Sequence, residues 1–157
     1  MQKITPCLWY DKEAEEAANL YISIFKNSKI TDITRYPEGA RGEPGTAMTV
    51  TFELDGVEFI GLNGGPQFKF NEAASFQIHT ADQAETDRIW NALIADGGEE
   101  GQCSWCKDKY GLSWQVTPDR LIELLKSPDK GVAMRVAAAM MQMRKIDIAK
   151  LEAAAKG

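Results

Sequence analysis

Hydrophobic and polar residues follow one pattern in the first half of the chain. Apolar or alternating runs predict strands at residues 4–10, 29–36, 46–54 and 57–62, with an Ala-rich amphipathic helix after the first strand. Asp11 is expected to cap that helix, which should end near Asn27. Asp55-Gly56 predicts a tight hairpin turn between the last two strands. The first half is therefore predicted to run strand, helix, strand, strand, strand.

The second half repeats this order in fewer residues. We predict a strand at residues 75–80, a helix from Asp82 to Gly97-Gly98, two short segments around 99–107 and a strand at 112–117. Shifting the sequence by 70 residues places Thr5 on Ser75, and a shift of 55 places Ile60 on Gln115. The predicted fold class is α+β, with two tandem βαβββ units.

After Pro118 the pattern becomes helical as far as Ala155, and Asp119 is expected to cap the first tail helix. Four methionines between residues 134 and 143 indicate an adaptable apolar face, typical of a core or a dimer contact. We therefore expect a single domain, 1–157, made of unit one (1–71), unit two (72–118) and a helical tail (119–157).

Composition narrows the possible partners. The chain has 157 residues, 44% of them hydrophobic, which suits one domain with a sizeable core. Its net charge of −5 argues against nucleic acid as a partner. No run approaches the roughly 20 apolar residues of a membrane span, and there is no signal-peptide pattern. An odd number of cysteines, three, suits a reducing compartment. We expect a cytoplasmic protein.

Charge is uneven along the chain. Residues 130–156 carry six basic and two acidic side chains, so this part of the tail is positive and the remainder is negative. A basic helical tail could lie on an acidic neighbour, such as a second copy of the chain, or its charges could simply face solvent.

A loop rich in Gly, Asn and aromatic residues joins the halves, at residues 61–76. Glycine allows close backbone approach, and Phe68 and Phe70 need apolar cover, so this loop could fold over a cavity. The alternative is a tight linker held by the two phenylalanines.

Two tandem βαβββ units resemble the vicinal oxygen chelate superfamily of glyoxalase I, dioxygenases and bleomycin-resistance proteins. Within it, two long stretches resemble the PhnB-like family, often labelled 3-demethylubiquinone-9 3-methyltransferase: LNGGPQFKFNEAASFQIHTADQAETDRIWNALIADGGEEGQCSWCKDKYGLSWQVTP and MQMRKIDIAKLEAA. The resemblance implies sheets curled around a cavity, helices on the convex side and a homodimer.

Neither a methyl donor nor a metal is expected. A donor nucleotide needs a Gly-rich turn that opens a helix, but Gly64-Gly65 is followed by Pro66 and an aromatic loop. The metal-ligand positions implied by the resemblance fall on Thr5, Ile60, Ser75 and Gln115. Only Gln115 could ligate, and one weak oxygen ligand does not hold a divalent ion. We predict no metal and no cofactor.

Strand alternation indicates the cavity residues. Thr5, Cys7 and Trp9 share one face of their strand, opposite Ile4 and Leu8, and Ser75, Gln77 and His79 share one face, opposite Phe76 and Ile78. The predicted ligand-binding residues are Thr5, Cys7, Trp9, Asn63, Ser75, Gln77, His79 and Gln115. The first hypothesis is a small-molecule-binding protein. The alternatives are a metal-dependent lyase or dioxygenase with unusual ligands, and a drug-sequestering resistance protein.

Three features leave alternatives open. His79, the one histidine, is either structural or an acid/base that needs a carboxylate partner such as Glu72 or Asp82. Cys103 and Cys106 are structural thiols, zinc ligands together with Cys7 or His79, or a redox pair. The aromatic side chains either line a pocket for a flat ligand or pack in the core, namely Trp9, Trp105, Trp114, Phe68 and Phe70.

Overall fold

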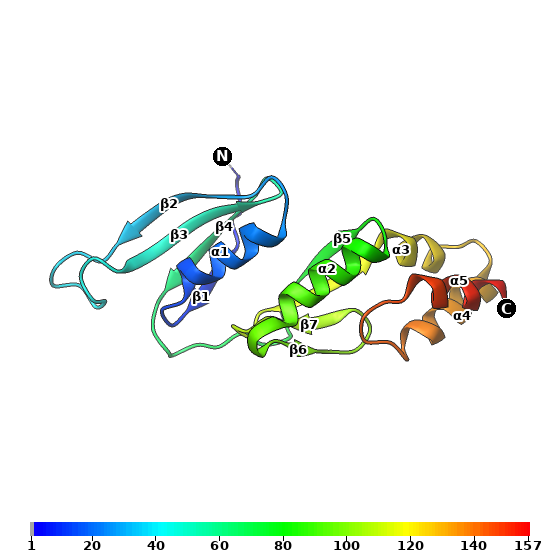
Figure 1. Ribbon diagram of the computed structural model, residues 1–157. Coiled ribbons are helices and arrows are strands. Elements are labelled where there is room, and N and C mark those ends of the chain that lie inside the picture. Colours follow the sequence, from blue (N-terminus) through cyan, green and yellow to red (C-terminus); the bar gives the residue numbers. More distant parts are fainter. Residues whose placement is uncertain (1) are drawn as a thin grey trace. The chain divides into compact units, whose positions relative to one another are not determined.

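Each half of the chain folds into a four-stranded sheet with one helix on it. The computed structural model describes residues 2–157, which divide into a first unit ending at Phe70 and a second unit, Asn71–Gly157. Figure 1 labels most of the strands and helices of both. The expected α+β class, with two βαβββ units and helices at the C-terminal end, is confirmed.

The first sheet has the strand order β1-β4-β3-β2. Its strands are β1 (Cys7–Tyr10), β2 (Lys29–Arg35), β3 (Ala47–Leu54) and β4 (Val57–Asn63). β1 is parallel to β4, and the other pairs are antiparallel. The predicted hairpin is confirmed, since Asp55 and Gly56 have φ angles of 47° and 80°. The first strand is shorter than predicted. It begins at Cys7, and Ile4, which the prediction included in the strand, lies outside it and is 83% exposed.

Helix α1 (Ala14–Ile24) lies close against this sheet because its buried face begins with small residues. Ala14, Ala17 and Ala18 are fully buried. A Cβ atom on Gly61 of β4 would lie 3.1 Å from Ala14 Cβ, so a larger residue there would press the helix outward. The prediction that Asp11 caps this helix is wrong, since the N-cap position is Glu13. The Asn63 Oδ1 atom instead accepts the Ala14 N–H at 2.9 Å.

The second sheet repeats the order, as β5-β8-β7-β6. Its strands are β5 (Ser75–Thr80), β6 (Glu99–Glu100), β7 (Trp105–Lys107) and β8 (Ser113–Pro118). Helix α2 (Gln83–Ile94) and the short 3₁₀ helix η1 (Ala95–Gly97) connect β5 to β6. The predicted cap is confirmed, since Asp82 Oδ1 accepts the Glu85 N–H at 2.8 Å.

Strand register confirms the internal repeat. Cys7 pairs with Ile60 in the first sheet, and Gln77 pairs with Gln115 in the second. These pairs are related by the same two shifts, 70 and 55 residues, that align the halves of the sequence. Equivalent positions of the sequence therefore occupy equivalent positions of the two sheets.

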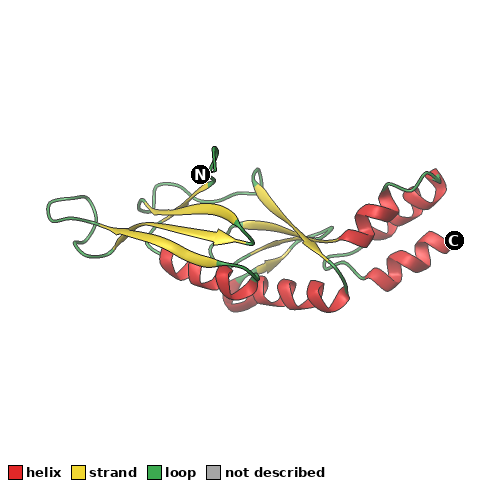
Figure 2. Ribbon diagram, turned by 90° about the horizontal axis from the view of Figure 1, so that it is seen from above, coloured by secondary structure: helices red, strands yellow, loops and turns green. Residues whose placement is uncertain are grey.

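In each unit a helix covers one face of the sheet, and no helix within residues 2–157 covers the other (Figure 2). We call the uncovered side the open face. Leu8, Tyr10 and Ile78 are buried on the helix side, whereas Gln77 and His79 alternate with them and are exposed. The first strand of each unit, β1 from Cys7 and β5 from Ser75, therefore alternates between the two faces as the sequence predicts.

The tail forms three helices that belong to the second unit: α3 (Asp119–Leu125), α4 (Lys130–Met140) and α5 (Ile148–Lys156). The prediction that Asp119 caps α3 is wrong, because Asp119 is its first helical residue and Pro118 is the N-cap. The tail encloses its own core of Leu121, Leu124, Val136, Met143, Ile146 and Leu151. No helix within residues 2–157 is long and apolar enough to cross a membrane.

The methionines of the tail divide between core and surface. Met143 joins the core, whereas Met134 and Met141 are 73% and 60% exposed. Basic tail residues meet acidic residues of their own unit: Arg144 pairs with Glu100 at 3.4 Å, and Lys145 with Asp87 at 2.8 Å. These two basic residues therefore lie on an acidic neighbour within the same chain.

A buried carboxylate organises the turn between β7 and β8. Asp108 is 2% exposed, and its Oδ1 atom accepts the N–H groups of Tyr110 and Leu112 at 2.9 and 3.1 Å. Its Oδ2 atom accepts the indole N–H of Trp114 at 2.9 Å. These bonds join the turn to the core.

Replacing this carboxylate should destabilise the second unit. Asp108→Ala leaves three donors without this acceptor, and we expect a loss of about 3 kcal/mol in the free energy of unfolding. Asp108→Asn should lose less, because an amide oxygen can still accept the two backbone bonds. Urea unfolding followed by tryptophan fluorescence measures both, with exposed Asp32→Ala as the control. Equal stability of Asp108→Ala and the parent protein would contradict this role.

The tail should loosen in acid through Glu152. Hydrogen bonds from Arg120 lower the pKa of Glu152 below its ordinary value of 4.5. A lowered pKa adds stability that is present above pH 4.5 and is lost as the pH falls through the lowered pKa. Thermal unfolding should therefore show Glu152→Gln less stable than the parent at pH 6, with the difference shrinking below pH 4.5. Glu38→Gln, in an exposed loop, is the control and should match the parent throughout.

Candidate functional site

Strand pairing in the second sheet brings polar side chains together on the open face. Residues far apart in sequence lie side by side in rows, because each strand pair is in register. The first row is Glu99, Lys107, Ser113 and Ser75; the second is Trp105, Gln115 and Gln77; the third is Thr117 and His79. Four of the eight predicted ligand-binding residues therefore lie together on this face.

Gln115 and Ser75 connect the first two rows. The Gln115 Nε2 atom donates to Ser75 Oγ at 2.9 Å. These are two of the four positions at which the resemblance implies a metal ligand. Here their polar groups hydrogen-bond to each other. No three His, Cys, Asp or Glu side chains among residues 2–157 gather in a group that could hold a metal ion.

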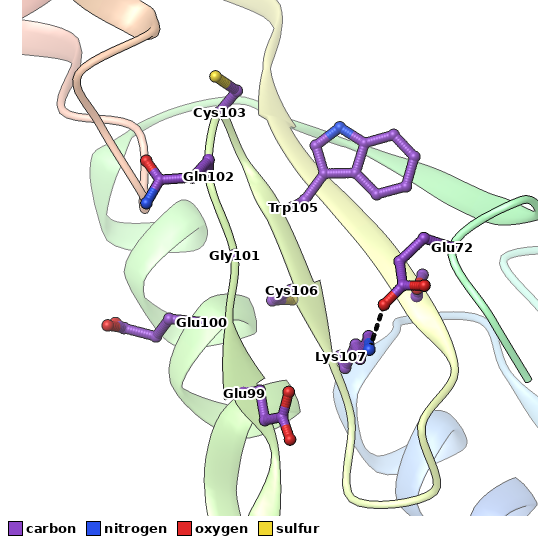
Figure 3. A pocket seen from close by; sticks show the side chains of 10 residues that line it. Glu72, Glu99, Glu100, Gly101, Gln102, Cys103, Trp105, Cys106 and Lys107 are labelled. Carbon is purple, nitrogen blue, oxygen red and sulfur yellow. Dashed lines mark ion pairs between the residues drawn. The ribbon is translucent and has the colours of Figure 1, made fainter.

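A hollow of about 560 Å³ opens at the β6–β7 edge of this sheet. Figure 3 shows the indole of Trp105 and the Glu72–Lys107 pair on one side of β7, with Glu100 pointing the other way. The lining residues are Glu72, Glu99, Glu100, Gly101, Gln102, Cys103, Trp105, Cys106, Lys107 and Ser113. The lining of the hollow thus includes three residues of the first row, Glu99, Lys107 and Ser113, and one of the second row, Trp105.

Acidic groups outnumber basic ones in the hollow. Lys107 forms an ion pair with Glu72, which lowers the pKa of Glu72 and raises the pKa of Lys107. Glu99 lies beside Lys107 in the strand register and adds to the rise in the Lys107 pKa. Within residues 2–157 the Glu99 carboxylate has no ion pair of its own. One negative charge therefore remains in excess on this part of the open face.

Two hydroxyl groups of the open face are buried without a hydrogen-bond partner among the described residues. Ser113 is 1% exposed and Thr117 is 4% exposed, and neither hydroxyl oxygen is bonded. A buried polar group without a partner costs about 1–3 kcal/mol. Ser113 is among the residues that line the hollow, and its hydroxyl oxygen lies just below that lining surface.

His79 has a carboxylate partner that sequence proximity did not indicate. Its Nδ1 atom lies 3.1 Å from Asp119 Oδ1, at the start of α3. The two candidates named from the sequence are engaged elsewhere, since Glu72 pairs with Lys107 and Asp82 caps α2. Both members of the pair are more than half exposed, so solvent reaches the imidazole.

In the first unit, Thr5 precedes β1, and Cys7 and Trp9 project from β1 on the open face. Thr5 Oγ1 bonds Glu58 Oε1 at 3.2 Å, and Trp9 Nε1 donates to Gly65 O at 2.9 Å. Phe68 of the glycine-rich loop packs edge-on against Trp9, with ring centroids 4.9 Å apart. The loop therefore contacts β1 through Phe68, which both interpretations of the loop allow.

Asn63 lies on the helix side of the first sheet. It is 8% exposed, and besides accepting from Ala14 its Nδ2 atom donates to Ala47 O at 3.0 Å. A hollow of about 790 Å³ borders Asn63, at the start of α1 and the loop after β2. It is larger than the one at Trp105, but the fold already uses both ends of this amide.

Of the two cysteines in the CxxC motif, one is at a turn and the other is in the core. Cys103 and Ser104, with φ angles of 55° and 79°, form the tight turn between β6 and β7. Cys106 is 2% exposed on the helix side of β7, and burial raises its pKa to about 12. A thiol with so high a pKa is a poor nucleophile and a poor metal ligand at neutral pH.

Residues 2–117 match the family described as 3-demethylubiquinone-9 3-methyltransferase. The chain belongs to this family. The PhnB-like resemblance read from the sequence is thereby confirmed. A comparison with curated protein sequences finds no match.

The first two of the following solved structures agree with the fold. A PhnB protein from Bacillus cereus, provisionally named 3-demethylubiquinone-9 3-methyltransferase, is 36% identical with a TM-score of 0.69, covering 74% of this chain and 99% of its own. A Pseudomonas aeruginosa protein is 18% identical with a TM-score of 0.61, over 75% and 98% of the two chains. A glyoxylase/bleomycin resistance protein/dioxygenase domain from Frankia is more distant, at 10% identity and a TM-score of 0.46, over 75% and 92%.

The residues of the hollow were largely missed by sequence reasoning. Glu99 and Lys107 lie on strands of two and three residues, too short to show an alternating pattern. Ser113 had a usable signal, because it lies two residues before Gln115 on the same strand face. Asp119 had none, since only the fold brings it to His79.

Thiol labelling should separate the three cysteines. Iodoacetamide at pH 7.5 should modify exposed Cys7 and half-buried Cys103 in the folded protein, and Cys106 only after denaturation. Peptide mass spectrometry identifies the sites. A disulfide between Cys103 and Cys106 in air-oxidised, folded protein would contradict the separation of the two thiols between turn and core.

Proposed function

We propose that this protein binds a small organic molecule on the open face of the second sheet. Trp105 contributes an apolar surface to the hollow on this face, and the predicted residues Ser75, Gln77, His79 and Gln115 contribute polar groups beside the hollow, although they are not among its lining residues. The observation that carries the proposal is the hollow of about 560 Å³, whose lining includes Trp105 and Ser113, and the Ser113 hydroxyl has no partner among the described residues. Thr5, Cys7 and Trp9 of the first unit, and Asn63, stay predictions as ligand residues.

Methyl transfer, which the family description names, finds little support in these residues. A methyl-donor nucleotide is usually held where a glycine-rich turn opens a helix in a doubly wound parallel sheet. In this chain the segment after Gly64-Gly65 runs to β5 without a helix. Both sheets combine one parallel pair with antiparallel pairs. Binding without a donor nucleotide is therefore the function we favour.

The His79–Asp119 pair favours a second candidate, proton transfer on the bound molecule. A carboxylate beside Nδ1 orients the imidazole ring, which a general base needs. The test is to find a ligand that the protein slowly converts and to compare its conversion by the parent protein and by His79→Ala. If His79→Ala still binds the ligand but no longer converts it, the protein is an enzyme; equal conversion by both proteins removes this candidate.

Binding should depend on the indole of Trp105. A thermal-shift screen of flat, amphipathic fragments should yield ligands, and Trp105→Leu should weaken them about tenfold through loss of aromatic contact. Phe68→Leu is the matched control, because Phe68 is an exposed aromatic residue of the first unit, and it should leave affinity unchanged. Equal affinities of Trp105→Leu and the parent for every ligand would contradict the proposed site.

A homodimer, which the family resemblance implies, stays a prediction. Light scattering coupled to size-exclusion chromatography should give a mass near twice the 17.4 kDa of the chain. A mass of one chain at every concentration would contradict it.

A further inference from the structure

We propose that the molecule bound in the hollow is an organic cation, with a flat apolar group on Trp105 and a protonated amine directed at the carboxylates. This inference rests on the proposed function and adds the chemical class of the ligand. Three independent features of the hollow carry it: its charge, its indole and its unpartnered hydroxyl.

The charge of the hollow suits a cation. Glu72 and Lys107 neutralise each other, and Glu100 pairs with Arg144. Glu99 keeps its negative charge on the same strand row as Lys107, at the rim of the hollow. An arriving ammonium group therefore meets a carboxylate without having to break an existing ion pair.

The same charges exclude an anion. A carboxylate or phosphate ligand would need the Lys107 ammonium, which is held by Glu72. It would also approach Glu99 and Glu72, two like charges on the same side of the strand. Like charges brought together in this way disfavour binding. Of the two kinds of charged ligand, the charges of the hollow therefore favour binding of a cation.

Trp105 supplies the surface for the apolar part. Its indole is half-buried in the hollow, beside Gln115 in the strand register. The face of an indole attracts cations more strongly than any other aromatic side chain, and it also stacks on flat groups. An aromatic amine would use both properties at once.

Ser113, in the lining of the hollow, supplies a further hydrogen-bond acceptor. Its hydroxyl is buried and lacks a partner among the described residues, and Ser113 faces Lys107 across the strand pair. An ammonium group has three N–H donors, so it can bond a carboxylate and still donate to a hydroxyl oxygen. The unsatisfied oxygen thus becomes bonded when the site is filled.

Three naphthalene probes of one shape test the class of ligand. 2-Naphthylmethylamine is a cation at pH 7, 2-naphthylmethanol is neutral and 2-naphthoate is an anion. Calorimetric titration of the full chain at low salt should give the order amine, alcohol, naphthoate, with the amine about fivefold tighter than the alcohol. Raising the salt to 0.5 M should reduce that preference by screening.

Three variants locate the effect. Glu99→Gln should abolish the preference for the amine and leave the affinity for the alcohol unchanged. Glu123→Gln removes the same charge from the tail, outside the hollow, and should keep the preference. Ser113→Ala should weaken the amine about fivefold without lowering the melting temperature of the free protein, because it removes an unbonded hydroxyl.

The outcomes separate the two proposals. If the alcohol or naphthoate binds through Trp105 at least as tightly as the amine, the cation is wrong and the binding site stands. If none of the three probes binds, the proposed site itself is contradicted. A preference for the amine that persists in Glu99→Gln overturns the role of the carboxylate. Unchanged affinity of Ser113→Ala, together with a lowered melting temperature, overturns the role of the hydroxyl.

Discussion

Close packing of one helix on one face of each sheet is the constraint from which the rest of the structure follows. In the first unit, Gly61 and Ala14 let α1 approach β4, and Asn63 from the end of that strand bonds the first N–H of the helix. In the second unit, α2 buries Ile89, Trp90 and Leu93 in the same position. In the second unit the apolar residues lie mainly on that side, so its open face is left to polar groups and the Trp105 indole.

The polar groups of the second open face work together because strand pairing holds them in rows. Glu99, Lys107 and Ser113 come from three strands and meet only when β6, β7 and β8 pair in register. The buried Asp108 carboxylate holds the turn from β7 to β8, and thereby the alignment of these strands. A change at this turn would therefore disturb the hollow without touching it.

The fold was largely predictable, and the site only in part. Strand alternation, the Asp55-Gly56 turn and the Asp82 cap are local signals, and the repeat register followed from two simple shifts of the sequence. The caps at Asp11 and Asp119 were wrongly predicted because a distant residue, Asn63, and a preceding proline take those roles. The partner of His79 and the row containing Glu99 depend on contacts between distant segments, which no local pattern encodes.

The central claim is that the second open face holds a small molecule. A crystal structure of the protein with a fragment that raises its melting temperature tests this claim most directly. The account predicts ligand density against the Trp105 indole, within hydrogen-bond distance of the Ser113 hydroxyl or the Glu99 carboxylate. Density for the fragment only elsewhere, such as the larger hollow beside Asn63 or the exposed methionines of α4, would contradict it.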